Sequence, residues 1–165
     1  MSVQLFLAIS IISIFHMFSL FLIINKLNKY KKVRNGLDLG VQFPEVNFED
    51  IKRNSYEFNN SVFDSFRVFV FLDSGCNECT KVLNAFKVIN LDLVKDIMII
   101  LTYTEDNISL STHPLKDRMI FIQLNVIQNE FKLNSFPFYL RVNNSGLVID
   151  KGYIASDSVM ESINR

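Results

Sequence analysis

The feature that most constrains this chain is a buried-strand pattern that runs directly into its two cysteines. Residues 66–72 are almost continuously apolar and rich in β-branched or aromatic side chains, which is typical of a strand covered on both faces. A short turn follows at residues 73–75. Cys76 and Cys79 then open a stretch with the apolar spacing of an amphipathic helix. The sequence therefore predicts a strand, a turn and a helix, with a CxxC pair where the helix starts.

The rest of the chain alternates between strand and helix patterns. An Asn/Ser/Gly turn between two hydrophobic runs predicts a C-terminal hairpin. A mixed sheet in an α/β domain is expected from this order. The predicted segments are an extended lead-in at 36–49, a turn-rich stretch at 54–64, helices at 79–93, 126–133 and 156–163 with Ser156 as N-cap, and strands at 66–72, 97–103, 119–124, 138–142 and 147–153.

The N-terminal segment predicts a membrane anchor. Residues 3–24 carry no charged side chain, and a helix that spans a bilayer needs about 20 predominantly apolar residues. The segment lacks the basic start, the short apolar core and the small-residue cleavage site of a signal peptide. We therefore expect a transmembrane anchor at residues 1–25, a basic juxtamembrane linker at 26–39 and one globular domain at 40–165.

The formal net charge of zero hides an uneven distribution. Five basic residues lie in residues 26–34, and beyond them the chain has 12 basic and 17 acidic residues. The basic linker favours anionic headgroups, so the lipid bilayer is an expected partner. The acidic remainder has no basic patch, which argues against nucleic acid as a partner. Taken alone, the position of the basic residues after the span places the domain in the cytoplasm.

The predicted position of the cysteines favours redox chemistry. Unpaired N–H groups and the dipole at a helix start favour thiolate over thiol at Cys76, and the thiolate is the species that attacks a disulfide. Cys79 lies one helical turn later, close enough to resolve a mixed disulfide. The pair would therefore carry two electrons reversibly.

Two cysteines this close together also have three possible structural uses. A structural zinc site needs four ligands, whereas the histidines are His16 in the apolar segment and His113 in a loop, so no metal is expected. A structural disulfide over so short a loop stabilises little. Two ordinary core thiols would not need a turn and a helix start.

A proline supplies a second signal. Phe136 and Pro137 precede the predicted strand at 138–142, and an X–Pro bond adopts the cis form at modest cost. A proline that merely opens a strand is the alternative interpretation.

Three segments, VFVFLDSGCNECTKVLNAF, NEFKLNSFPFYLRVNNSGLVIDKGYI and GVQFPEV, together resemble membrane-anchored thioredoxin-like proteins, the TlpA-like and MauD-like disulfide oxidoreductases. The resemblance covers roughly residues 40–163. It implies a thioredoxin-like α/β fold, with a mixed central sheet flanked by helices, and no cofactor. It also implies Cys76 as the nucleophile and Cys79 as the resolving cysteine, with Phe136, Pro137 and Gly75 at the substrate groove.

The chain departs from that family pattern at three positions. Gly75 stands where thioredoxin has Trp before its first cysteine. Val70 and Val82 stand where relatives carry an acid that assists proton transfer. Proton transfer at the resolving cysteine must then use water, Asp73 or Glu78, although a turn-forming role for Asp73 is the simpler interpretation.

We therefore expect a membrane-tethered thiol-disulfide oxidoreductase that exchanges disulfides with protein substrates and with a membrane or soluble redox partner. Anchored relatives work outside the cytoplasmic membrane, where disulfides form, so the resemblance implies an extracytoplasmic domain on a single-pass anchor. The basic residues after the span favour the opposite, cytoplasmic location. The alternatives are a non-catalytic interaction domain and an assembly factor that handles Cu(I). A peroxiredoxin would need Thr where this chain has Asp73.

Overall fold

The computed structural model describes residues 10, 12–24, 35–50, 52, 54–58, 62–102, 110 and 112–163. The chain divides into two compact units, Met1–Arg34 and Asn35–Arg165. In the first unit, residues 12–24 are helical. Within the part of the chain that is described, no helix has both the length and the apolar character needed to cross a bilayer. The predicted span at residues 3–24 lies partly outside the described residues.

The second unit starts at Asn35, five positions before the predicted domain boundary at residue 40. Asn35, Gly36 and Leu37 are buried. The side-chain amide of Asn35 donates to the carbonyl oxygen of Ser135 at 2.9 Å, and its oxygen accepts from the backbone N–H of Asn134 at 2.8 Å. These bonds hold Asn35, which the sequence places in the linker, against the segment before β6.

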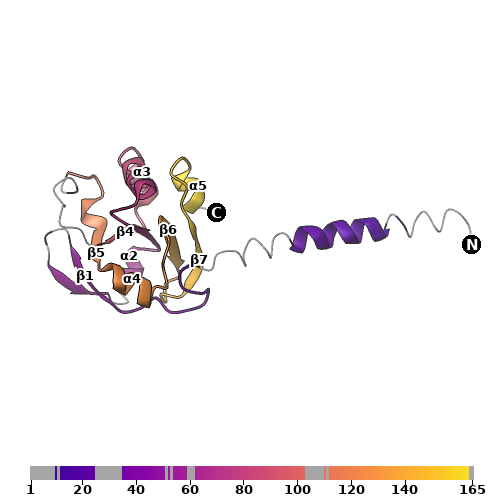
Figure 1. Cartoon of the computed structure of the whole chain (residues 1–165), viewed down its shortest axis with the longest axis horizontal. Helices are drawn as coiled ribbons and strands as arrows, with labels where there is room; N and C mark the ends of the chain where they lie inside the picture. Colours follow the sequence, from indigo (N-terminus) through magenta and orange to yellow (C-terminus); the bar gives the residue numbers. More distant parts are fainter. Residues whose placement is uncertain are drawn as a thin grey trace, which may run out of the picture. The chain divides into compact units, whose positions relative to one another are not determined.

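A mixed β-sheet with helices on both faces forms this second unit (Figure 1). Its elements are, in chain order, β1 (Asn47–Asp50), β2 (Ser55–Glu57), α2 (Val62–Ser65), β3 (Val68–Leu72), α3 (Asn77–Phe86), the 3-10 helix η1 (Leu91–Val94), β4 (Ile97–Thr102), the 3-10 helix η2 (Lys116–Arg118), β5 (Met119–Ile122), α4 (Leu124–Glu130), β6 (Phe138–Val142), β7 (Val148–Tyr153) and α5 (Val159–Ile163).

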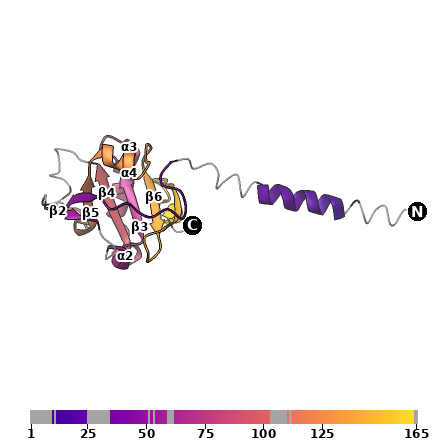
Figure 2. The same ribbon diagram turned by 90° about the horizontal axis from the view of Figure 1, so that it is seen from below.

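Among the described residues the strands follow the order β2-β1-β5-β4-β3-β6-β7. Figure 2 shows β5, β4, β3 and β6 following one another across the middle of the sheet. The strands β3, β4 and β5 are parallel to one another. The remaining pairs are antiparallel, including the C-terminal hairpin of β6 and β7. The strand β3 lies between β4 and β6, so both of its hydrogen-bonding edges are occupied.

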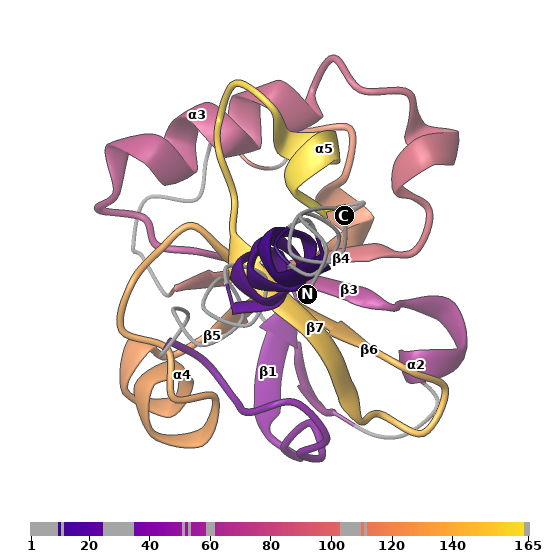
Figure 3. The ribbon, with the colours of Figure 1, turned by 90° about the vertical axis from the view of Figure 1, so that its right-hand side faces the viewer.

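The five residues of β3 are all buried because alternate side chains enter two different cores. Val68, Val70 and Leu72 belong to the apolar cluster that includes residues of α3 and α5. Phe69 and Phe71 belong to a network of aromatic rings on the other face, with the members Phe43, Phe48, Tyr56, Phe58, Phe63, Phe69, Phe71 and Phe131. Figure 3 shows α3 and α5 on one side of the sheet and α2 and α4 on the other.

The predicted central strands and the hairpin are present, whereas several boundaries differ. The helix α3 starts at Asn77 rather than at residue 79 and ends at Phe86, and a turn at residues 87–90 separates it from η1. Residues 54–64 were predicted as turns, yet they contain β2 and α2. The helix α5 starts at Val159, and the predicted N-cap Ser156 instead donates its hydroxyl to Glu78.

Candidate active site

The turn between β3 and α3 lies at the carboxyl edge of the parallel strands. The backbone N–H of Cys76 donates to the carbonyl oxygen of Asp73 at 3.2 Å, and this bond closes the turn. In α/β sheets, ligands bind most often at this edge, because the loops that follow the strands meet there. The local pattern of strand, turn and helix thus places both cysteines at the edge of the sheet where α/β proteins most often bind ligands.

Cys76 is the N-cap of α3 and is partly exposed. Its sulfur accepts a hydrogen bond from the backbone N–H of Cys79, with 3.2 Å between Sγ and nitrogen. The first N–H groups of a helix have no partner within the helix, and together with the helix dipole they favour a negative charge. The site therefore presents an accessible sulfur that receives a hydrogen bond at the start of α3.

Cys79 occupies the opposite environment, since only 2% of its surface is exposed. Its sulfur accepts a hydrogen bond from the backbone N–H of Asp73 at 3.4 Å. Burial raises the pKa of the Cys79 thiol above its ordinary value of 9.0, and the neighbouring Cys76 sulfur raises it further. Both cysteines are free thiols, so the site pairs an accessible sulfur with a shielded one.

The Phe136–Pro137 segment reaches the same place from a distant part of the chain. The peptide bond between these two residues is cis. The Cys76 sulfur lies 3.8 Å from the carbonyl oxygen of Phe136. The side chain of Phe136 packs against the apolar cluster to which Cys79 belongs. The structure thus brings the backbone of Phe136, which precedes the cis bond to Pro137, to the CxxC turn. The role of these two residues in a substrate groove stays a prediction.

Gly75 precedes Cys76 in the turn, and its surroundings are open. A Cβ atom added at Gly75 would meet one side-chain atom, Oδ2 of Asp73, at 3.5 Å, which is an ordinary contact distance. No bulky side chain therefore shields the Cys76 sulfur from this position.

A small polar cluster behind the turn escaped our sequence reasoning. The hydroxyl of Thr102 donates to Oδ1 of Asp73 at 2.7 Å and accepts from the backbone N–H of Ser74 at 3.0 Å. The parallel register pairs Leu72 with Leu101, which places the next two residues, Asp73 and Thr102, beside each other. The sequence contains a signal for this cluster, because Asp73 and Thr102 each end an apolar run. That the two residues are neighbours follows only from the register of β3 and β4.

The valines at the family's acid positions are fully buried. Val70 and Val82 have no exposed surface, and both belong to the apolar cluster that contains Cys79. The interior side of Cys79 is therefore hydrocarbon, and neither position offers a group that could take up a proton.

Glu78, which lies between the cysteines, is directed away from them by two partners. Lys81 donates to Oε1 at 2.5 Å, and the hydroxyl of Ser156 donates to Oε2 at 3.0 Å. These bonds, with the Lys81 bond the stronger influence, lower the pKa of Glu78. The carboxylate is thus ionised and held at the surface of α3.

His113, considered in the sequence as a metal ligand, uses both ring nitrogens elsewhere. Nδ1 accepts from the backbone N–H of Leu115 at 3.1 Å, so Nε2 carries the proton and donates to the carbonyl oxygen of Leu83 at 3.0 Å. The ring is 2% exposed. Among the described residues, no group of three or more His, Cys, Asp or Glu side chains is arranged to hold a metal ion.

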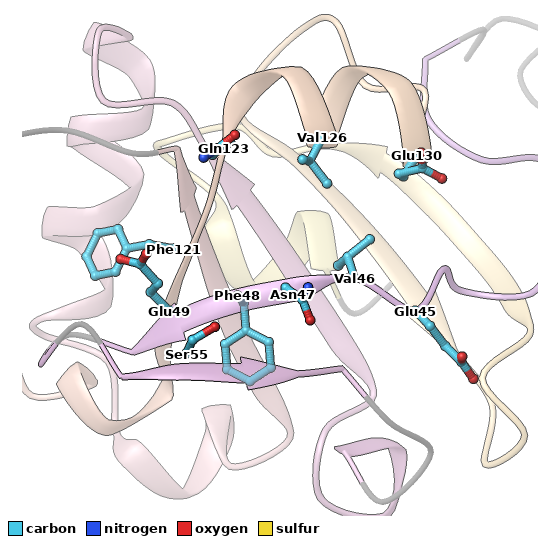
Figure 4. Close-up of a pocket in the computed structure, with 10 residues that line it drawn as sticks. All are labelled: Glu45, Val46, Asn47, Phe48, Glu49, Ser55, Phe121, Gln123, Val126 and Glu130. Atoms are coloured by element: carbon cyan, nitrogen blue, oxygen red, sulfur yellow. The ribbon is translucent and has the colours of Figure 1, made fainter.

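A pocket of about 430 Å³ lies elsewhere in the domain, between β1 and α4 (Figure 4). Neither cysteine lines it. Its lining residues are Glu45, Val46, Asn47, Phe48, Glu49, Ser55, Phe121, Gln123, Val126 and Glu130.

No protein-family model matches the chain, and no curated protein matches it. Solved structures do. The thioredoxin domain of a thiol-disulfide oxidoreductase from Bacteroides vulgatus matches with a TM-score of 0.55 and 17% identity over 78% of this chain and 96% of that chain.

Two further solved structures agree with this match. A protein described as a thiol:disulfide interchange protein DsbE, from Chlorobium tepidum, has a TM-score of 0.56 and 15% identity over 71% of this chain and 86% of its own. The exposed lipoprotein thioredoxin Etrx1 of Streptococcus pneumoniae has a TM-score of 0.51 and 10% identity over 72% of this chain and 96% of its own. The α/β part of the predicted fold class is confirmed: the chain has a thioredoxin-like α/β fold with a mixed sheet and flanking helices, and these structural neighbours are thioredoxin-like thiol-disulfide oxidoreductases. The transmembrane helix predicted to precede this fold stays a prediction.

Proposed function

We propose that this protein is a membrane-tethered thiol-disulfide oxidoreductase that acts on protein substrates through Cys76 and Cys79. One observation carries the proposal: an accessible sulfur caps α3 and receives an N–H bond, while a shielded thiol lies one turn further on. This asymmetry suits the two steps of disulfide exchange, because one sulfur reacts with the substrate first and the other reacts only with the mixed disulfide.

The exchange proceeds in two steps that balance electrons and atoms. The Cys76 thiolate attacks one sulfur of a substrate disulfide, forms a mixed disulfide and releases the first substrate thiolate. The Cys79 thiolate then attacks Sγ of Cys76, forms the Cys76–Cys79 disulfide and releases the second substrate thiolate. The substrate gains two electrons and the protein loses two. The reverse sequence oxidises a substrate dithiol, and the reduction potential of the pair sets the direction.

The residues around Cys76 support an extended peptide as the substrate. Phe136 brings a backbone carbonyl to 3.8 Å from the reactive sulfur, and Gly75 leaves the approach open. Backbone groups that flank a reactive atom recognise main chain rather than a particular side chain. We assign Phe136, Pro137 and Gly75 to the substrate groove on this basis.

A membrane tether is supported by the N-terminal sequence. Residues 3–24 lack charge, basic residues follow them, and every residue in the described helical stretch 12–24 is exposed although most are apolar. An all-round apolar helix is expected to find an apolar environment. We place the domain on the extracytoplasmic side, where disulfides persist. Labelling of intact cells with a membrane-impermeant maleimide tests this, since labelling only after lysis would put Cys76 in the cytoplasm.

The activity itself is tested by trapping. The Cys79→Ala variant of the full chain should accumulate mixed disulfides through Cys76, which dithiothreitol releases, whereas Cys76→Ser should accumulate none. Equilibration of the unaltered chain with glutathione buffers gives the reduction potential, with a value near about −270 mV indicating a reductant and one near about −120 to −180 mV an oxidant or isomerase. A chain that forms no Cys76–Cys79 disulfide in any buffer would overturn the proposed function.

A further inference from the structure

Before Cys79 attacks the mixed disulfide, its thiol must lose a proton, and its surroundings oppose that loss. The thiol is buried, so the charged form lacks solvation. Val70 and Val82 supply only hydrocarbon around the same cluster. Unassisted ionisation at neutral pH would therefore leave very little reactive thiolate, and a base close to the sulfur would remove this obstacle.

Asp73 is in contact with the sulfur that must be deprotonated. Its backbone N–H donates to Sγ of Cys79 at 3.4 Å. The side chain of Asp73 is attached to the Cα next to this nitrogen. The negative charges of Cys76 and of the Asp73 carboxylate both raise the pKa of the Cys79 thiol. Oδ2 of Asp73 faces the turn, 3.5 Å from where a Cβ of Gly75 would lie. The carboxylate is thus on the CxxC side of the turn and is partly exposed.

Thr102 holds the carboxylate in this position. Its hydroxyl donates to Oδ1 of Asp73 at 2.7 Å, and the N–H of Ser74 donates to the same hydroxyl at 3.0 Å. Thr102 is 2% exposed and lies at the end of β4, so the rigid sheet fixes the direction of its hydroxyl. An aspartate that served only as a turn former would not need a buried hydroxyl from a neighbouring strand.

We propose that Asp73 accepts the proton of the Cys79 thiol and that Thr102 is its positioning residue. The inference rests on the proposed disulfide exchange and names the base for its second step. The proton passes from Sγ to the carboxylate, the resulting thiolate forms the Cys76–Cys79 bond, and the substrate thiolate leaves with the electron pair of the broken bond. The carboxylic acid then returns its proton to the departing thiolate or to water.

Glu78 does not compete for this role. Its carboxylate is engaged by Lys81 and Ser156 on the outer side of α3. Among the described residues, Cys76 and Asp73 are the groups whose charges affect the pKa of Cys79. At this stage the sulfur of Cys76 is bonded to the substrate in the mixed disulfide and cannot accept a proton. Asp73 is then the remaining base at the sulfur.

The test uses the reduced full chain and dithiobis(nitrobenzoate), whose coloured thiolate leaves once for each step. Attack by Cys76 releases the first thiolate, and resolution by Cys79 releases the second. The rate of the second release in Asp73→Asn should fall by about a hundredfold at neutral pH and then rise about tenfold per pH unit, because hydroxide replaces the carboxylate. The first release should change little, which would show that the substitution affects the second step and not the attack by Cys76.

The opposite result would overturn the inference. If Asp73 acts only as a negative charge beside Cys79, its neutralisation lowers the pKa of that thiol, and the second release becomes faster or stays the same. Absence of any second release in the unaltered chain would instead overturn the proposed function itself, so the two failures are distinct.

Variants of Thr102 test the positioning role. Thr102→Val removes the hydroxyl and should slow the second release by about tenfold, whereas Thr102→Ser keeps the hydroxyl and should restore the rate to within about twofold. Asp92→Asn, at an exposed carboxylate of η1, is the matched control and should leave both phases unchanged. Equal rates for Thr102→Val and Thr102→Ser would exclude the hydroxyl from the step.

Discussion

The hydroxyl of Ser156 donates a 3.0 Å hydrogen bond to Oε2 of Glu78, so the segment before α5 is tied to the dipeptide between the cysteines. Lys81 holds the other oxygen at 2.5 Å. A fixed negative charge therefore lies beside the reactive turn, although its closest partner is a cation. Charges at the rim of a site act mainly on the approach of charged reactants.

Glu78→Gln should change the reaction of Cys76 with charged reagents more than its intrinsic reactivity. The variant removes the negative charge and frees the positive charge of Lys81. At low salt we expect Cys76 to react about two- to threefold faster with the anionic dithiobis(nitrobenzoate), and at an unchanged rate with neutral dithiodipyridine. Initial rates at two salt concentrations measure this, with the exposed Glu130→Gln as control. An equal acceleration with both reagents would mean that Glu78 acts on the sulfur itself.

Alkylation should separate the two cysteines by their burial. Cys76 is accessible, whereas Cys79 is shielded and its pKa is raised, chiefly by burial. With iodoacetamide at neutral pH we expect Cys76 to be modified at least about a hundredfold faster. In Cys76→Ser, the rate at Cys79 should keep rising with pH beyond 9.0, the ordinary pKa of a thiol, without a plateau. Peptide mapping by mass spectrometry measures both rates, and comparable rates would contradict the buried position of Cys79.

The sequence allowed prediction of those parts of the fold that depend on local pattern. The run from Val68 to Leu72 is apolar at every position because both faces of β3 are covered, and a β-branched and aromatic run of this kind has few other structures available. The CxxC at the start of α3 follows from the same local signals. The hairpin at Asn143 to Gly146 was equally clear, because its turn residues are characteristic.

The parts that escaped prediction depend on contacts between distant residues. Thr102 becomes significant only because the register of β3 and β4 sets it beside Asp73, and no local pattern contains that register. Asn35 looks like a linker residue, yet its amide is bonded to the segment before β6. Ser156 is a residue type that often caps a helix, but its hydroxyl instead donates to Glu78 on α3.

Two glycine substitutions should differ strongly in their effect on stability. Gly146 has a φ of +75°, and an added Cβ would lie 2.5 Å from Cε2 of Phe63 and from Nε2 of Gln42. Gly146→Ala should therefore lower the free energy of unfolding by about 2–4 kcal/mol. At Gly75, where φ is not in the left-handed region and the nearest atom is 3.5 Å away, the change to Ala should shift it by less than about 1 kcal/mol. Urea unfolding measures both, and a similar loss at the two positions would contradict these environments.

His113 should make the domain less stable in weak acid. Burial lowers the pKa of its imidazole below the ordinary value of 6.5, and the nearby Lys87 lowers it slightly more, while the bond to Leu83 acts in the opposite sense. The ring is therefore neutral in the folded state, and protonation would place a hydrogen on Nδ1, which now accepts from Leu115. Below about pH 6.5 the unfolded chain binds a proton that the folded chain resists, so the free energy of unfolding falls as the pH decreases.

Urea unfolding of the full chain between about pH 7.5 and pH 5 measures this contribution, with His113→Gln as the comparison. The variant should lose about 1–3 kcal/mol at neutral pH, because the bonds to Leu83 and Leu115 are disturbed in a buried position. Its stability should then depend less on pH than that of the unaltered chain, since the titrating group is gone, and the two curves should converge as the pH falls. Parallel curves over this range would show that His113 is not the group responsible, and would direct attention to the carboxylates, whose stabilising contributions are lost at lower pH.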